Sequence, residues 1–183
     1  LKAINSNLPD DLAVRWIDKV PALFHPRFDA LSRTYRYRLF FGDIRNPLDE
    51  RFAWRVWPKA ADLVSLANIW IGTHDFSSFG SPTSPRGSTT RKVSRCEWER
   101  KGEEWFFEIE ADAFLYRMVR RLVYVQVAAG QGRVETSDLV SALDGTAEER
   151  ESARKKIPAG LAKACGLSLI HVKYDDQELI LID

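Results

Sequence analysis

The sequence is poor in the residues that build metal sites and disulfide frameworks. It contains two cysteines, Cys96 and Cys165, and three histidines, His25, His74 and His171, none of them at the spacing of a metal site. We therefore predict no metal centre and a structural role for each histidine. So few cysteines are typical of a reducing setting, and we expect a cytoplasmic protein.

The chain also lacks a charge excess and a long apolar run. Its 27 basic and 26 acidic residues leave a net charge of +1, so a nucleic-acid or membrane partner has to be argued from local clusters. No segment approaches the length of a membrane span, and no signal peptide opens the sequence. Because residue 1 is a leucine and not a methionine, we expect a processed, truncated or cloned fragment. The 183 residues, 45% of them hydrophobic, suffice for one sizeable core.

Hydrophobic periodicity predicts an α+β unit. Strands are expected over 34–41, 93–100, 104–111 and 167–174, and helices over 60–71, 111–130, 136–143 and 147–156. This is the βαββαβ order of a ferredoxin-like unit, with a mostly antiparallel sheet and helices on one face. We divide the chain into residues 1–33, a connecting loop with a strand over 12–20, and a C-terminal domain, 34–183, whose tail has β-like character.

One basic segment is the predicted helix over 111–130, ADAFLYRMVRRLVYVQVAAG, around which we expect the rest of the chain to be organised. Asp112 is its expected N-cap, and no acidic residue follows to neutralise Arg117, Arg120 and Arg121. Residues four apart share a helix face, so we predict that the rings of Tyr116 and Tyr124 flank Arg120. Such a cation suits an ion pair or a phosphate, although a solvated basic face is the simpler interpretation of this segment alone.

Two further basic clusters precede this helix. Arg27, Arg33, Arg36 and Arg38 stand against Asp29 alone, and the loop over 81–90 carries Arg86 and is followed by Arg91 and Lys92. The solvated face of a strand accounts for Arg36 and Arg38. The loop is either a flexible surface segment or a phosphate contact.

Several blocks, in register from Asn5 to Tyr174, resemble the TruA family of tRNA pseudouridine synthases. They are NSNLP (5–9) with LAV (12–14), FHPRF (24–28) with YRY (35–37), HDFSSF (74–79), FLYRMVR (114–120) and ACGL (164–167). The family's Gly-Arg-Thr-Asp block, which carries its catalytic aspartate, does not occur in these 183 residues. The resemblance therefore implies the C-terminal part of a longer enzyme, inactive by itself.

The resemblance also implies a set of site residues. Tyr35 falls on the tyrosine that packs against the target uracil, Arg120 on the arginine that pairs with the aspartate, and Leu167 on the apolar wall of the uracil pocket; we expect Tyr116 to contact the substrate too. The implied reaction converts uridine to pseudouridine in the anticodon stem-loop of tRNA, by a homodimer and without a metal or organic cofactor. The expected RNA contacts are Arg27, Arg33, Arg86, Arg91, Lys92, Arg117 and Arg121.

Two other classes of function remain open at this point. A non-catalytic RNA-binding module with a ferredoxin-like sheet is one alternative, although the chain lacks the aromatic pattern with which such modules stack bases. A protein-interaction or dimerisation domain is the other, and it leaves the paired arginine and tyrosine positions unexplained.

Overall fold

The computed structural model describes residues 1–175, so the β-like tail predicted beyond them lies outside the described residues. The described residues form two compact units, one of residues 1–31 with 173–175, and the other Ser32–Val172. Within the described part, no helix is both long enough and apolar enough to cross a membrane.

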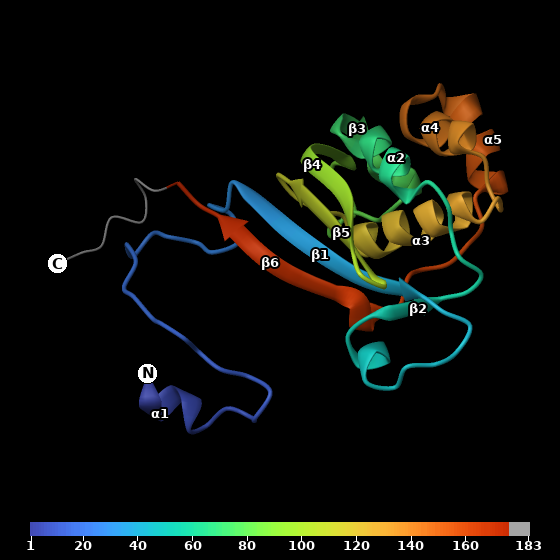
Figure 1. Cartoon of the computed structure of the whole chain (residues 1–183). Helices are drawn as coiled ribbons and strands as arrows, with labels where there is room; N and C mark the ends of the chain where they lie inside the picture. The colour runs from blue at the N-terminus through green and yellow to red at the C-terminus, as the bar shows by residue number, and fades with distance from the viewer. Residues whose placement is uncertain (176–183) are drawn as a thin grey trace. The chain divides into compact units, whose positions relative to one another are not determined.

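The Ser32–Val172 unit is built on a six-stranded sheet (Figure 1). β5 and β4 form a hairpin, and β5 also pairs with β1 in antiparallel register, Tyr35 opposite Ile109. β3 continues the sheet beyond β4, while β2 and β6 both pair with β1. The strands are β1 (Ser32–Phe41), β2 (Trp54–Val56), β3 (Gly72–Asp75), β4 (Thr90–Lys101), β5 (Glu104–Ala111) and β6 (Leu167–Lys173).

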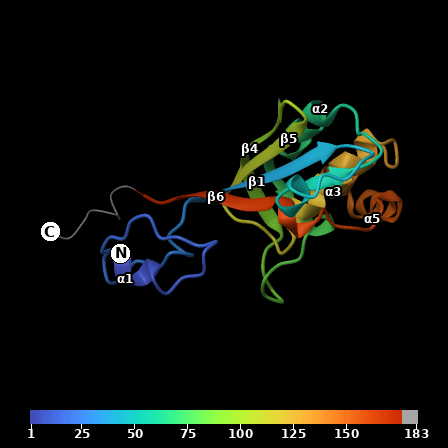
Figure 2. The ribbon, with the colours of Figure 1, turned by 60° about the horizontal axis from the view of Figure 1, so that its bottom comes forward.

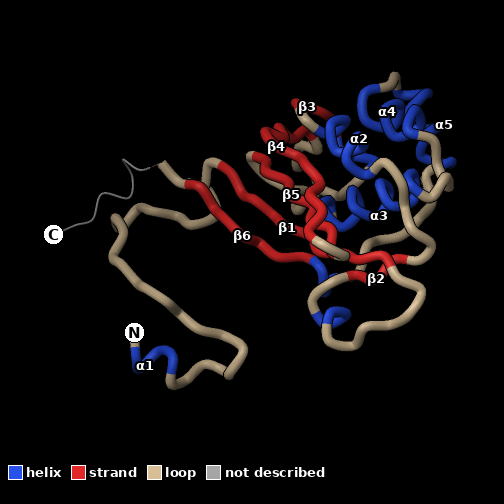
Figure 3. The backbone as a smooth tube through the Cα atoms, in the orientation of Figure 1, coloured by secondary structure: helices blue, strands red, loops and turns tan. Residues whose placement is uncertain are grey.

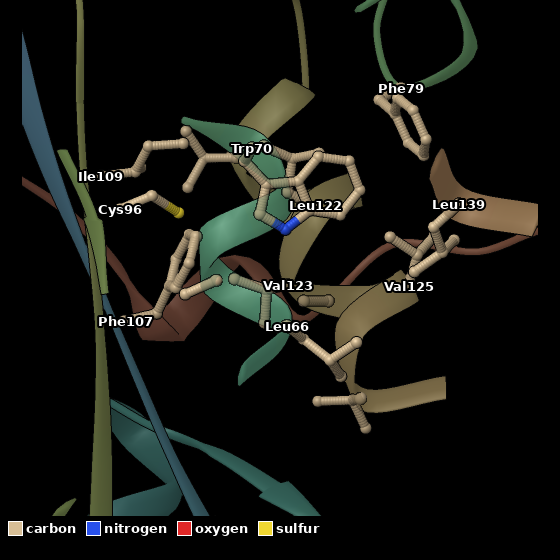
Figure 4. Close-up of a cluster of buried hydrophobic side chains, with 14 of the residues drawn as sticks. Leu66, Trp70, Phe79, Cys96, Phe107, Ile109, Leu122, Val123, Val125 and Leu139 are labelled. Carbon is tan, nitrogen blue, oxygen red and sulfur yellow. The ribbon is translucent and has the colours of Figure 1, made fainter. Parts of the chain in front are cut away.

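Helices cover one face of this sheet, as the turned view of Figure 2 also shows. They are α2 (Leu63–Ala67), α3 (Met118–Gly130), α4 (Thr136–Asp144) and α5 (Ala147–Lys156), with short 3-10 helices η1 (Asp49–Arg51), η2 (Asn68–Trp70), η3 (Phe76–Ser78) and η4 (Ala164–Gly166). The core lies between the layers: Phe107 and Ile109 of β5 meet Trp70, Leu122 and Val123 from the helical side (Figure 4). Burial of this apolar face is the main force holding the layers together.

The opposite face of β1, β4 and β5 carries paired charges, and we call it the outer face. Arg36 Nη2 lies 2.6 Å from Glu108 Oε1, and Arg95 Nη2 lies 2.7 Å from Oε2 of the same carboxylate. Arg38 Nη2 is paired with Glu104 at 2.5 Å. The alternation of β1, which buries Tyr37 and Leu39 on the helical side, places these arginines here.

The predicted α+β class, the antiparallel sheet and the helices on one face are confirmed. The strand predicted over 12–20 is wrong, because these residues form no strand and the unit of residues 1–31 is loop apart from α1 (Lys2–Asn5), as Figure 3 shows. Trp16 in this segment is 75% exposed. Strand propensity was the only signal there, and a strand also needs a partner for its backbone groups.

The long helix predicted over 111–130 begins only at Met118. Asp112 does not cap it: its Oδ1 accepts the backbone N–H groups of Ala113 and Lys92. Tyr116 instead forms an isolated β-bridge with Ser81, and Arg117 adopts a left-handed conformation with φ of 65°. A residue in that conformation cannot continue a right-handed helix, so the helix starts after it.

Candidate active site

Tyr35 lies on β1 at the margin of the core. Its half-buried ring packs edge-on against Phe114, with centroids 5.0 Å apart and planes at 87°. The alternation of the strand places it on the same side as the buried Tyr37, which faces the helices. Tyr35 therefore has an aromatic ring fixed on one side by Phe114 and partly open to solvent.

Arg120 lies in the first turn of α3 and holds the segment that precedes β6. Its Nε donates to the carbonyl of Ala162 at 2.7 Å, while the Ala162 N–H donates to the Arg120 carbonyl at 3.2 Å. Nη1 and Nη2 of Arg120 make no hydrogen bond within residues 1–175. The fork of the guanidinium is therefore available to a carboxylate.

Tyr37 connects the elements around this site. Its hydroxyl donates to the Lys163 carbonyl at 2.7 Å. Burial raises the pKa of Tyr37 far above its usual value, with a further increase from Cys165 and a smaller opposing effect of the Arg120 charge. The phenol therefore stays protonated and acts as a hydrogen-bond donor that fastens the chain before β6 to β1.

Leu167 begins β6, immediately after η4. It is half-buried against the core, and Gly166 before it allows the close approach: a Cβ at position 166 would stand 2.5 Å from the Arg38 carbonyl oxygen and 2.8 Å from the Tyr37 ring. The predicted residues Tyr35, Arg120 and Leu167 thus come from β1, α3 and β6. Each is connected with Tyr37: Tyr35 shares its strand face, the charge of Arg120 acts on its hydroxyl, and Leu167 follows Gly166, which lies against its ring. Sequence reasoning missed Tyr37 as a positioning residue, although strand alternation already placed it beside Tyr35.

The arginines at the start of α3 and just before it have other aromatic partners than those predicted. Arg117 lies over the Tyr116 ring at 4.7 Å, and Arg121 over the Tyr124 ring at 5.8 Å. The predicted row of Tyr116, Arg120 and Tyr124 is wrong because Tyr116 precedes the helix, so four-residue helical spacing does not apply to it. Tyr116 itself is 57% exposed.

Arg121 holds the loop that follows α5. Its Nη1 donates to the carbonyls of Pro158 at 2.7 Å and Gly160 at 3.0 Å. Burial lowers the pKa of Arg121, with a partial offset from Tyr124, but an arginine remains charged at neutral pH. Its guanidinium therefore stabilises the loop as well as contributing positive charge at the surface.

The other arginines and lysines expected to contact RNA are dispersed. Arg86 and Lys92 make no side-chain hydrogen bond or ion pair within the described residues, whereas Arg91 donates to the carbonyls of Ser88 and Thr90. Arg33 Nη1 donates to the Asp112 carbonyl at 2.8 Å. Arg27 belongs to the other unit, where its guanidinium lies 5.7 Å from the Phe28 ring.

The HDFSSF block joins the sheet to the last two helices. His74 Nδ1 lies 2.6 Å from Asp144 of α4, and Arg150 of α5 donates to Asp75 Oδ2 at 2.5 Å. Burial raises the pKa of the Asp75 carboxyl, but hydrogen bonds from Thr89 and Ser77, together with the Arg150 charge, bring it below its usual range. Within residues 1–175, no three His, Cys, Asp or Glu side chains are grouped as a metal site.

Comparison with known proteins matches this chain to RNA-modifying enzymes. A family model described as tRNA pseudouridine synthase matches residues 66–175. Proteins named tRNA pseudouridine synthase A are 36% identical in Methylacidiphilum infernorum (97% of this chain, 68% of the relative), 35% in Variovorax paradoxus (96% and 64%) and 32% in Geobacter sp. strain M21 (87% and 66%). The chain thus spans about two thirds of the length of these relatives.

Proposed function

Because the chain belongs to the tRNA pseudouridine synthase family, we propose that it is the C-terminal part of an enzyme that isomerises uridine to pseudouridine in the anticodon stem-loop of tRNA. The C–N glycosidic bond breaks, the uracil turns, and a C–C bond forms. The catalytic aspartate comes from a segment outside these 183 residues, and the chain by itself has no turnover. Its partners are tRNA and a second subunit, in the cytoplasm.

The observation that carries this proposal is the convergence of Tyr35, Arg120 and Leu167 around Tyr37. Tyr35 offers a ring anchored by Phe114, against which a uracil packs. Leu167 supplies the apolar wall of the pocket. These residues come from three elements distant in sequence, and neither RNA binding alone nor dimerisation explains why they meet.

Arg120 holds the incoming aspartate in its ionised form. Its Nε is occupied by the Ala162 carbonyl, which fixes the direction of the guanidinium. Nη1 and Nη2 then form hydrogen bonds to the carboxylate. A positive charge at hydrogen-bond distance stabilises the ionised form of the carboxyl group. An ionised aspartate is the form that acts as a nucleophile or a base in this reaction.

The target nucleotide has to leave the stack, so the protein contacts mainly phosphates and the extruded base. Arg86, Lys92 and Arg117 have charges that no described carboxylate neutralises, and they are the strongest of the proposed contacts. Arg27, Arg33, Arg91 and Arg121 complete the set, each with part of its guanidinium already engaged in the fold.

The test begins with the coding DNA upstream of the Leu1 codon. We expect an open frame with a Gly-Arg-Thr-Asp block, and tritium release from C5-labelled tRNA by the product of the extended frame but not by the 183-residue chain. Turnover by the chain alone would refute the missing-aspartate proposal. An upstream frame without the aspartate would favour the non-catalytic RNA-binding module instead.

A further inference from the structure

A groove of about 320 Å³ runs between η3, the start of α3 and α5. Three arginines line it, Arg117, Arg121 and Arg154, together with serine residues that include Ser81, and no aspartate or glutamate is among its lining residues. A second groove of about 320 Å³ adjoins it and shares Ser77, Ser78 and Arg154. The concentration of cations in a concave surface attracts an anionic ligand.

Arg154, like Arg117, is a groove cation without an ion pair among the described residues. The other cations of α5 have partners: Arg150 pairs with Asp75, Lys155 with Glu151 and Lys156 with Asp138. Arg154 makes no hydrogen bond or ion pair within residues 1–175. It lies one helical turn after Arg150, so both arginines project from the same side of α5.

The helix that presents Arg154 is fixed in position. Thr146 and Glu149 form a capping box at its start, and Arg150 donates both to Asp75 of β3 and to the Gly145 carbonyl. The charge of Arg154 therefore stands on a rigid element, and little ordering of the backbone is needed before a ligand binds.

The other wall of the groove combines a cation with an aromatic ring. Arg117 lies over the Tyr116 ring, and Tyr116 is attached to Ser81 by backbone hydrogen bonds of 2.8 and 3.4 Å. This wall continues into the candidate active site: Arg121 and Leu161 line the groove, and their neighbours Arg120 and Ala162 are hydrogen-bonded to each other.

We propose that this groove binds the RNA backbone beside the target nucleotide, with Arg154 and Arg117 contacting a phosphate from opposite walls. The inference rests on the proposed function and adds α5 to the RNA-binding surface. A polynucleotide fits better than an acidic protein because the groove offers an exposed aromatic ring beside its cations and leads directly to Arg120. The adjoining groove extends the path along the strand.

The test measures the affinity of the chain for unmodified tRNA by fluorescence anisotropy at several salt concentrations. Arg154→Gln removes the proposed phosphate contact, and Lys155→Gln is the matched control, since it removes the same charge from the next residue, outside both grooves. Arg154→Lys keeps the charge. We expect Arg154→Gln to weaken binding about five- to tenfold at low salt and to lower the slope of log K against log salt by about one.

The outcomes separate this inference from the proposed function. Near-normal binding by Lys155→Gln and by Arg154→Lys, with the expected loss in Arg154→Gln, supports the groove. Equal affinities of Arg154→Gln and Lys155→Gln overturn it while leaving the proposed function intact. Absence of tRNA binding by the unmodified chain overturns both, and groove-dependent binding without turnover of the extended enzyme overturns only the proposed catalysis.

Discussion

The outer face of the sheet and the groove beside α5 are both rich in arginine. They differ in whether carboxylates of the protein pair with those arginines. On the outer face, Arg36 and Arg95 share Glu108, and Arg38 pairs with Glu104. In the groove, Arg117 and Arg154 form no ion pair with a carboxylate among the described residues. The charges of the outer face are therefore neutralised within the protein, whereas the positive charge of the groove can attract an external anion.

The difference shows why the near-neutral net charge of this chain says little about RNA. Antiparallel pairing brings Glu108 of β5 directly opposite Arg36 of β1, and Glu104 into the diagonal position beside Arg38. Cross-strand neighbours of opposite charge stabilise each other, so these arginines belong to the sheet. The groove arginines come from α3, the residue before it and α5, where no strand register supplies a partner.

The largest effect that separates the two regions is expected at Arg120. In the extended enzyme, Arg120→Ala removes the cation that holds the aspartate ionised, and kcat/KM should fall on the order of 10²–10³-fold. Arg38→Ala on the outer face is the control and should change kcat/KM by no more than about threefold. Tritium release with thermal unfolding of each variant makes the measurement, and equal losses at both positions would refute the role given to Arg120.

Asp75 neutralises Arg150 beside the groove, and Asp75→Asn should break that local balance. Several hydrogen bonds to its carboxylate are lost, so we expect the free energy of unfolding at pH 7 to fall by about 1–3 kcal/mol. Because folding lowers the Asp75 pKa, its contribution is complete above the unfolded value of about 4 and disappears as the pH falls through the folded value.

Urea unfolding between pH 7 and pH 3 tests this prediction. The variant should lose less stability on acidification than the natural chain, whereas Asp43→Asn, an exposed control, should follow the natural profile. RNA affinity of Asp75→Asn should not decrease, because Arg150 gains an uncompensated charge. Parallel pH profiles for Asp75→Asn and the natural chain would contradict the assignment.

Glu104→Gln with Glu108→Gln should make the outer face resemble the groove. Arg36 and Arg38 lose their carboxylate partners, and Arg95 keeps only Glu97. We expect this to cost about 1–2 kcal/mol of stability, since partly exposed pairs contribute at most about 1 kcal/mol each. Non-specific RNA affinity at low salt should rise several-fold. Glu103→Gln, at the exposed tip of the hairpin, measures the effect of removing one charge without freeing these arginines. If the RNA affinity of the double variant rises by no more than twice the rise in Glu103→Gln, the result contradicts the comparison.

The smallest expected effect concerns the strained backbone at Arg117. Asparagine tolerates the left-handed region better than arginine, so Arg117→Asn should raise the free energy of unfolding by up to about 1 kcal/mol. The same change should weaken tRNA binding a few-fold because a groove cation is lost. Arg154→Gln, where the backbone is helical, should weaken binding without raising stability, and equal stabilities would argue against strain at Arg117.

The sequence by itself determined the fold class and the family. Alternation over 34–41 and 104–111 predicted the central strands, because a strand with one face in the core repeats every two residues. The motif blocks from Asn5 to Leu167 predicted membership of the tRNA pseudouridine synthase family, which the matches to known proteins confirm. Both the alternation and the motif blocks are local patterns, which can be recognised in the sequence without knowing the tertiary contacts.

Local patterns were misleading where a distant partner decides the conformation. The helix of residues 111–130 lost its first turns because Ser81 pairs with Tyr116, and the segment over 12–20 has strand propensity without a strand to pair with. Neither outcome is encoded in the periodicity of the segment itself.

Only the tertiary structure decided which arginines are neutralised. Four arginines have the same side chain and different surroundings: Arg36 pairs across the sheet, Arg120 is held through its Nε, Arg121 holds a loop and Arg154 lines a groove. A guanidinium interacts with whatever lies within a few ångströms, and its neighbours come from elements dozens of residues away. The convergence of Tyr35, Arg120 and Leu167 around Tyr37 has the same physical origin.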